Sequence, residues 1–197
     1  MLLDRALPDF DVTQVRHIVV EASPEATFEA VRAWDPAGMQ SPAVRWLTWL
    51  RALPEHIGRG SRGGSAPAHT DEAEGATGLE RMAQWGWIPL GEEPCRELVA
   101  GLVGQFWKPV IEPLHIEAGE FAAFDEPGYA KLAVSFSVRP YGAERTLLTY
   151  EVRTATTDAT ARRWFRWYWR VIGPFAGLLM GLGLRDIRAM ARAADGR

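Results

Sequence analysis

The sequence predicts an α+β fold in which a curved antiparallel sheet wraps around one long C-terminal helix. Residues 158–194 predict that helix, because apolar side chains recur along them at steps of three and four. Between residues 79 and 154, strand-like segments are separated by short turns, which is typical of antiparallel pairs. Two short helices are expected after the first strand. This segregation of strands and helices favours a single two-layer domain over residues 1–197.

The N-terminal part is expected to supply the first strand and the two short helices. We expect residues 1–16 to be a leader that packs on the surface and residues 17–22 to be the first strand. Ser-Pro pairs at 23–24 and 41–42 predict two helix starts, since serine caps free N–H groups and proline is tolerated in the first turn. Residues 58–78 are rich in glycine, alanine and serine and predict a mobile loop.

The middle of the chain is expected to supply the rest of the sheet. The predicted strands are residues 82–90, 96–107, 129–138 and 145–154. Residues 91–94 carry glycine and proline and predict a turn, whereas residues 117–124 fit a short strand or a helical turn. In the last strand, alternation places Leu148, Tyr150 and Val152 on one face.

One face of the C-terminal helix is predicted to pack on the sheet. Asp158 precedes the helix as a cap, because its carboxylate accepts hydrogen bonds from free N–H groups of the first turn. Gly173 and Pro174 predict a kink, since proline lacks the N–H and clashes one turn back. The residues at helical spacing that we expect to face the sheet are Trp164, Tyr168, Val171, Phe175, Leu178 and Leu182.

Composition restricts the classes of function. The formal net charge is −3, so there is no overall electrostatic case for binding nucleic acid. Cys95 is the single cysteine, which favours a reducing, cytoplasmic compartment, and the N-terminal residues do not resemble a signal peptide. The nearly uncharged run 170–185 is shorter than the about 20 residues that span a membrane, so a buried helix is favoured over membrane contact.

No cofactor or metal is expected. Residues 58–63 match the spacing G-x-G-x-x-G, but a helix rather than a strand is predicted before them, which disfavours a dinucleotide site. Cys95 is expected to be a structural thiol rather than a nucleophile. The histidines lack the spacing of paired metal ligands on a helix: His17, His56, His69 and His115.

Three stretches carry a resemblance to a known superfamily: RELVAGLVGQFWKP at residues 96–109, EFAAFDEPGYAKLAVSFSV at 120–138 and TYEVRTATTDATARRWFRWYWRVIGPFAGLL at 149–179. With the order of the elements, they resemble the helix-grip fold of the START-like (SRPBCC) superfamily, which includes polyketide cyclase/dehydrase-like and Bet v 1-like proteins. The resemblance covers residues 17–193 and is to a bacterial branch of that superfamily. It implies a hydrophobic ligand held between the sheet and the C-terminal helix.

The ligand space is expected to be mainly apolar, with few polar groups. From the pattern alone, aromatic residues at these spacings more often fill a solid core, whereas the resemblance favours a cavity. The residues that we expect to line the cavity are Trp87, Phe106, Phe136, Tyr150, Trp164, Tyr168 and Phe175.

Charged residues leave the chemistry open, and no residue is predicted to be catalytic. Glu97, Glu120 and Glu151 are candidates for an inward-facing acid, but alternation places Glu151 and Arg153 opposite Tyr150, which favours a solvated strand face. The arginines of the last helix favour a solvated face over a site for phosphate or anionic lipid: Arg162, Arg163, Arg166 and Arg170.

The leading functional prediction is a protein that binds a hydrophobic small molecule or lipid. One alternative is a cofactor-independent enzyme, such as a polyketide cyclase, aromatase or dehydratase, that acts in the same cavity. The other is a lipid carrier that docks on membranes through the apolar end of the last helix.

Overall fold

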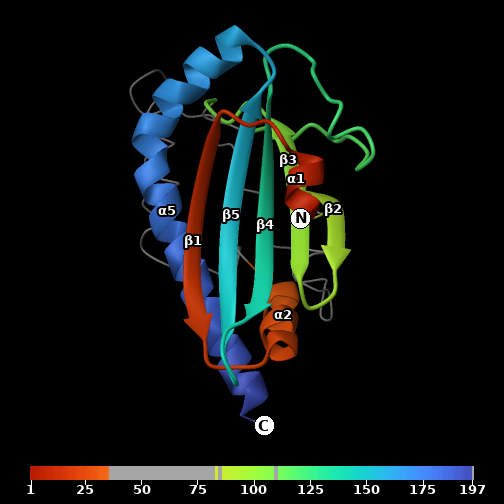
Figure 1. Cartoon of the computed structure of the whole chain (residues 1–197). Helices are drawn as coiled ribbons and strands as arrows, with labels where there is room; N and C mark the ends of the chain where they lie inside the picture. Colours follow the sequence, from red (N-terminus) through yellow and green to blue (C-terminus); the bar gives the residue numbers. More distant parts are fainter. Residues whose placement is uncertain (36–82, 84–85, 109–110, 197) are drawn as a thin grey trace, which may run out of the picture.

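The computed structural model describes residues 1–35, 83, 86–108 and 111–196. The elements in chain order are α1 (Leu2–Ala6), β1 (Val12–Val20), α2 (Pro24–Ala33), β2 (Ile88–Glu93), β3 (Glu97–Gly104), β4 (Ala130–Pro140), β5 (Thr146–Thr156) and α5 (Ala159–Asp195). The five strands form an antiparallel sheet in the order β1-β5-β4-β3-β2 (Figure 1). The predicted α+β class, with an antiparallel sheet and a long C-terminal helix, is confirmed.

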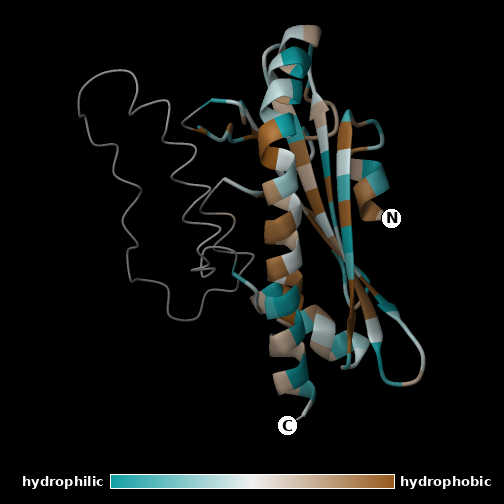
Figure 2. Cartoon of the chain, turned by 90° about the vertical axis from the view of Figure 1, so that its left-hand side faces the viewer, coloured by the Kyte–Doolittle hydropathy of each residue, from teal (hydrophilic) through white to brown (hydrophobic). Residues whose placement is uncertain are grey.

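The sheet lies between helices on its two faces. Figure 2 shows α5 and α2 on one side of the sheet and the short α1 on the other. We call the side toward α5 the inner face and the side toward α1 the outer face. The predicted start of α2 is confirmed: the Ala26 N–H donates to the Ser23 hydroxyl oxygen at 3.2 Å, and Pro24 occupies the first turn.

The segment expected to be a leader, residues 1–16, contains α1 and the first half of β1, so the first strand begins five residues earlier than the predicted residue 17. β1 begins at Val12 and pairs with β5 along its whole length, so backbone hydrogen bonding extends the strand beyond its β-branched half. Leu3 and Leu7 lie four residues apart and are both buried against the outer face. A helix of five residues is too short to show a hydrophobic period in the sequence.

The turn expected at residues 91–94 is also wrong. β2 continues to Glu93, with a shift in its register between Pro89 and Gly91. The turn follows it, closed by a hydrogen bond from the Arg96 N–H to the Glu93 carbonyl at 3.0 Å. Cys95, in the third position of this turn, has a φ of 58°, a feature of type II turns that also favour proline before it.

Three sequence predictions fall on residues outside the described ones. They are the helix from residues 41–42, the loop at 58–78 and part of the strand at 82–90, of which residues 82, 84 and 85 are not described and residues 88–90 belong to β2. Residues 117–124 are described, and they contain turns rather than a strand. Phe121, within those turns, is fully buried on the outer face.

α5 is attached at both of its ends. The Asp158 carboxylate accepts hydrogen bonds from N–H groups of the first turn at 2.6 and 2.9 Å, which confirms the predicted cap, and it also accepts from the Gly128 N–H. The hydrogen bonds from Ala161 and Gly128 hold the pKa of Asp158 below its ordinary value. At the far end, the Ser23 hydroxyl donates to the Asp195 carboxylate at 2.9 Å.

The buried face of α5 differs from the predicted one. Trp164, Val171 and Leu178 were expected to face the sheet, but all three are exposed. α5 instead approaches the neighbouring elements through glycines: a Cβ on Gly177 would lie 2.5 Å from side-chain nitrogens of Gln14 and Arg16 on β1. Hydropathy cannot identify a face of this kind, because its small residues carry little apolar surface. The buried residues of α5 are Ala161, Phe165, Ile172, Gly173, Gly177, Met180, Gly183, Leu184, Ile187 and Ala191.

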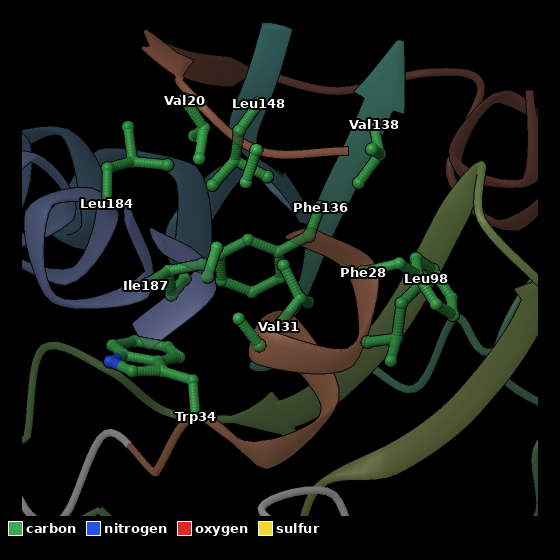
Figure 3. Close-up of a cluster of buried hydrophobic side chains, with 13 residues drawn as sticks. Val20, Phe28, Val31, Trp34, Leu98, Phe136, Val138, Leu148, Leu184 and Ile187 are labelled. Carbon is green, nitrogen blue, oxygen red and sulfur yellow. The ribbon is translucent and has the colours of Figure 1, made fainter. Parts of the chain in front are cut away.

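The main hydrophobic core lies where α2, the second half of α5 and the sheet meet. Figure 3 shows Val31 and Trp34 of the α2 segment near Ile187 of α5, whereas Phe28 of α2 lies beside Leu98. Leu184 of α5 belongs to the same cluster. The sheet contributes the remaining labelled residues: Val20, Leu98, Phe136, Val138 and Leu148. This end of the inner face is therefore a packed core, and the first half of α5 covers the other end.

Candidate functional site

The inner face of the sheet presents a continuous apolar surface. It is built by alternate residues of three adjacent strands, as period-two alternation requires. Its members in the middle of the sheet are Ala100, Leu102, Leu132, Val134, Phe136, Tyr150 and Val152. The alternation predicted for β5 is therefore confirmed, β4 alternates in the same way, and together they form the surface on which a ligand site has to be sought.

Two of the predicted lining residues belong to a tightly packed aromatic group. Phe136 and Tyr150 stack with ring centroids 4.2 Å apart. Trp34 meets both rings edge-on, at centroid distances of 5.6 Å and 6.5 Å. Offset and edge-on pairs of this kind add to the stability that burial supplies. At this position the solid-core interpretation of the aromatic residues applies.

A second aromatic group covers the end of the inner face beneath the first turns of α5. Phe165 is its buried centre, and its ring lies 5.6 Å from that of Trp169 and 5.9 Å from that of Tyr168. Phe106 is buried in the same cluster, and Trp87 is half-buried at its border with the middle of the sheet. Phe106, Tyr168 and Trp87 thus belong to one cluster, and their role in lining a ligand cavity stays a prediction.

The remaining lining predictions have different outcomes. Trp164 is exposed on the far side of α5, so its assignment to the wall is wrong. Phe175 is half-buried on α5. Trp169 and Ile172 face the inner side instead, and sequence reasoning missed them because the predicted face was rotated toward the larger aromatic residues.

Tyr150 places a hydroxyl group between the two aromatic groups. Burial raises the pKa of Tyr150 to about 12, because the phenolate would be poorly solvated there. Within the described residues its hydroxyl makes no hydrogen bond to a side chain or the backbone. The neutral phenol is therefore a hydrogen-bonding group rather than a base at physiological pH.

Gln14 adds a second polar group on the same face, and the sequence analysis missed it because the strand was expected to begin at residue 17. Gln14 lies opposite Val152 in the β1–β5 ladder. Its side-chain nitrogen donates to the Gly173 carbonyl of α5 at 3.2 Å. Its side-chain oxygen is buried and has no partner among the described residues. A buried acceptor of this kind is costly unless something donates to it.

The candidate acids lie on the other side of the sheet or in solvent. Glu97 is buried on the outer face, where its carboxylate accepts from the N–H groups of Leu2 at 2.6 Å and Leu3 at 3.2 Å and from the Ser135 hydroxyl at 3.0 Å. Glu120 is exposed. Glu97 therefore serves to hold α1 on the sheet.

Glu151 and Arg153 also face outward, as alternation predicted, but they are not solvated. Their side chains are 15% and 11% exposed, and the Arg153 Nε lies 2.7 Å from the Glu151 carboxylate. Arg153 also pairs with Asp4 of α1 at 2.9 Å, and the Phe10 ring stacks on its guanidinium. The N-terminal segment covers this pair, which corrects the expected solvated face.

Histidines and the cysteine do not form a metal or nucleophile site in the described part of the chain. No group of three or more His, Cys, Asp or Glu residues is placed to hold a metal ion there. His17 pairs with the Thr149 hydroxyl at 2.9 Å on the outer face, and His115 is exposed. The G-x-G-x-x-G match at 58–63, His56 and His69 lie outside the described residues.

A separate hollow of about 820 Å³ lies between α1, the start of α2 and the β2–β3 turn, and Cys95 is among the residues that line it. Its charged residues pair with one another: Glu93 lies 3.5 Å from Arg5 and 3.8 Å from Arg96. Glu97 borders it but is committed to α1. This hollow is a surface groove between these elements, and it is lined by none of the residues predicted to form the ligand site.

Comparison with known proteins does not identify a family for this chain. No protein-family model matches the chain, and no curated protein matches it. A search of solved structures finds the crystal structure of TTHA0849 from Thermus thermophilus, with 8% sequence identity, a TM-score of 0.34, and 93% of this chain and 99% of that chain covered. A TM-score of this size does not establish a shared fold. Among the described residues, no helix is both long and apolar enough to cross a bilayer.

Proposed function

We propose that the chain has a helix-grip fold of the START-like kind and binds a hydrophobic small molecule or lipid between the inner face of the sheet and α5. The supporting observation is the buried, unpartnered side-chain oxygen of Gln14 beside the apolar middle of the inner face; Arg16, the next inward-facing residue of β1, also lies against Gly177 of α5. Small-molecule sites are mainly apolar, with few polar groups that orient the ligand. Gln14 and the Tyr150 hydroxyl are groups of that type. The single cysteine fits a cytoplasmic location.

The chemistry of these two groups indicates which ligands fit. The Gln14 oxygen is a hydrogen-bond acceptor, so it selects a ligand with a hydroxyl or N–H group on an apolar body. Tyr150 is neutral at physiological pH and either donates or accepts. Trp87, Tyr168 and Trp169 are only half-buried and offer ring surface to the apolar body. The ligand class is therefore an apolar molecule with one donor group.

A matched pair of probes tests the proposal. We expect 2-naphthol to raise the melting temperature of the protein more than naphthalene does, because only 2-naphthol can donate to Gln14. Gln14→Leu should remove the difference between the two probes, whereas Thr13→Val, on the exposed opposite side of β1, should preserve it. Equal shifts with both probes in the wild-type protein would remove Gln14 from the site.

Steric blocking gives an independent test of the location. Leu132 points to the inner face and Lys131, its neighbour on β4, points to the outer face; both are half-buried. Leu132→Trp should abolish the shift with either probe, and Lys131→Trp should leave it unchanged. Native mass spectrometry of the gently purified protein should also detect a co-purifying small molecule. The binding function would be rejected if neither probe raised the melting temperature, Leu132→Trp had no effect, and native mass spectrometry detected no small molecule.

The enzyme alternative requires an acid or base beside the Tyr150 hydroxyl. Within the described residues, the candidate acids Glu97 and Glu151 lie on the outer face and Glu120 is exposed. No observation therefore favours a cyclase or dehydratase over a binding protein, and we propose binding alone.

A further inference from the structure

The side of α5 that faces away from the sheet carries large exposed apolar residues. Trp164, Val171 and Leu178 are 55%, 55% and 51% exposed, and Trp167 is 63% exposed. Residues seven apart in a helix lie in line, two turns from one another, and Trp167 lies one turn along from Trp164. We call these four residues the apolar stripe of α5. A contiguous exposed apolar stripe on an otherwise well-packed protein marks an interaction surface.

Arginines run beside this stripe. α5 contains no aspartate or glutamate before Asp186, in a chain whose formal net charge is −3. Arg162 pairs with Asp11 at 2.7 Å. Arg163, Arg166 and Arg170 make no salt bridge to any carboxylate in the described part of the chain, and the Arg170 guanidinium lies 5.1 Å from the Trp167 ring centre. Positive charge is therefore concentrated on this side of the helix.

The arginines surround a hollow of the size of a lipid head group. A hollow of about 360 Å³ lies on the surface of the first turns of α5. Its lining residues are Ala159, Arg162, Arg163, Arg166, Trp167 and Arg170. Guanidinium groups bind phosphate through paired hydrogen bonds, so a hollow lined in this way fits an anionic phosphate ester. The apolar stripe borders it directly through Trp167.

We propose that this side of α5 docks on an anionic phospholipid membrane. Helices that lie in the membrane interface combine tryptophan and aliphatic residues on one side with arginine or lysine beside them, so that apolar side chains enter the acyl boundary while cations reach the head groups. α5 has this arrangement, and no described helix is able to span the bilayer. Figure 1 shows the first turns of α5 beyond the ends of the strands, where a flat surface has access to them.

Two other occupants fit the surface less well. In a symmetric dimer each copy presents the same patch, so Arg163, Arg166 and Arg170 would face their own equivalents and repel one another. Nucleic acid would satisfy the arginines and stack on the tryptophans, but Val171 and Leu178 would remain in solvent. An anionic bilayer satisfies the cations and the aliphatic residues together. The proposal uses the side of α5 opposite to the ligand site and is independent of it.

Vesicle co-sedimentation tests the proposal with the full-length protein. We expect binding to vesicles of phosphatidylcholine with phosphatidylserine and little binding to phosphatidylcholine alone. Binding should weaken as salt is raised, because exposed charges are screened within about 8 Å at physiological ionic strength. No sedimentation with anionic vesicles at low salt, or equal sedimentation with both vesicle types, would overturn the proposal.

Variants separate the two contributions. Combined Arg163→Gln, Arg166→Gln and Arg170→Gln should weaken binding by about fivefold for each arginine and flatten the salt dependence. Combined Trp164→Ser and Trp167→Ser should weaken binding at every salt concentration. These residues are exposed, so we expect each variant to keep the wild-type melting temperature. Unchanged binding in both variants would overturn the proposal.

The β4–β5 loop offers a matched control. Tyr141 is 48% exposed in the β4–β5 loop, with the Arg145 guanidinium 5.3 Å from its ring centre. Combined Tyr141→Ser and Arg145→Gln removes a similar aromatic–arginine pair and should leave vesicle binding unchanged. Light scattering tests whether a second copy of the chain binds this surface, and a binding assay with a single-stranded oligonucleotide tests whether nucleic acid does. Self-association or oligonucleotide binding that depends on the α5 tryptophans, without vesicle binding, would assign the surface to that partner instead.

Discussion

At the scale of single residues, buried polar groups explain how this sheet is covered on both faces. Glu97 is the first residue of β3 and the only polar one in that strand. Its carboxylate accepts three hydrogen bonds on the outer face. Tyr150 and Gln14 bring polar atoms to the inner face. The sequence placed Tyr150 on the inner side correctly by alternation. Glu97 was a candidate for an inward-facing acid and lies on the outer face instead, where the N–H groups of Leu2 and Leu3, from a distant part of the chain, bind it.

Glu97→Gln should destabilise the protein. The amide group places a donor where the N–H groups of Leu2 and Leu3 need an acceptor, and hydrogen bonds to charged groups contribute about 1.5–3 kcal/mol each. We expect the free energy of unfolding, measured in urea, to fall by about 2–3 kcal/mol. Glu93→Gln is the control, because its pairs with Arg5 and Arg96 are exposed and should contribute less than about 1 kcal/mol. Equal effects of both variants would contradict this role for Glu97.

Tyr150 should titrate late, because its phenol is buried. Its pKa in the folded protein is about 12 against an ordinary value of 10.0, so the unfolded chain loses this proton first as the pH rises. The stabilising contribution is fully present below pH 10.0 and is lost as the pH approaches 12. Absorbance titration of the phenolate should show a late step that Tyr150→Phe removes. Loss of a step near pH 10.0 instead of a late one would place Tyr150 in solvent.

At the scale of elements, α5 shows what a hydrophobic pattern reveals about a helix and what it conceals. Its existence and its cap followed from the sequence, because helical spacing and Asp158 are local signals. Its buried face did not, because α5 packs closely through Gly173, Gly177 and Gly183, which carry no apolar side chain. Trp164, which helical spacing placed on the buried face, is exposed instead, and so is Trp167.

Two glycine substitutions should have opposite effects on stability. A Cβ on Gly181 meets no atom within 4 Å, so Gly181→Ala should stabilise the helix by about 0.5–1 kcal/mol through helix propensity. A Cβ on Gly183 would lie 2.7 Å from the Trp34 ring, and this rigid ring has to move. Gly183→Ala should therefore destabilise the protein by about 1–3 kcal/mol. Thermal unfolding of the two variants checks the difference, and stabilisation by both would refute close packing at Gly183.

At the scale of the whole molecule, the class of fold was predictable, and the cover on the outer face was not. Alternation in β3–β5 and the helix signals after Ser23 and Asp158 are encoded in neighbouring residues. α1 is five residues long, and its place on the sheet depends on partners such as Glu97 and Arg153 that are about a hundred residues or more away along the chain. Some aromatic residues of the candidate site were predictable, but Trp164 was wrong, Trp169 was missed, and Gln14 depended on the true start of β1.

Removal of residues 1–10 should expose the outer face. Leu3 and Leu7 would no longer cover the sheet, and burial of each side chain contributes about 1.5–3 kcal/mol. Arg153 would also lose Asp4. We expect a loss of at least about 3 kcal/mol in the free energy of unfolding and new binding of an apolar dye. Arg5→Ala, an exposed change within α1, should leave both unchanged. A truncated protein as stable as the full chain would show that α1 is dispensable.

The attachment of α5 at its two extremities restricts how a small molecule enters. Asp158 ties the first turn to Gly128, and Asp195 ties the last turn to Ser23. Because both ends of α5 are held, the helix does not move away from the sheet as a rigid body about one end. The ligand proposed above would therefore enter from the side, past the half-buried Trp87 and Trp169, or by a local opening near Pro174, where the helix lacks one backbone donor.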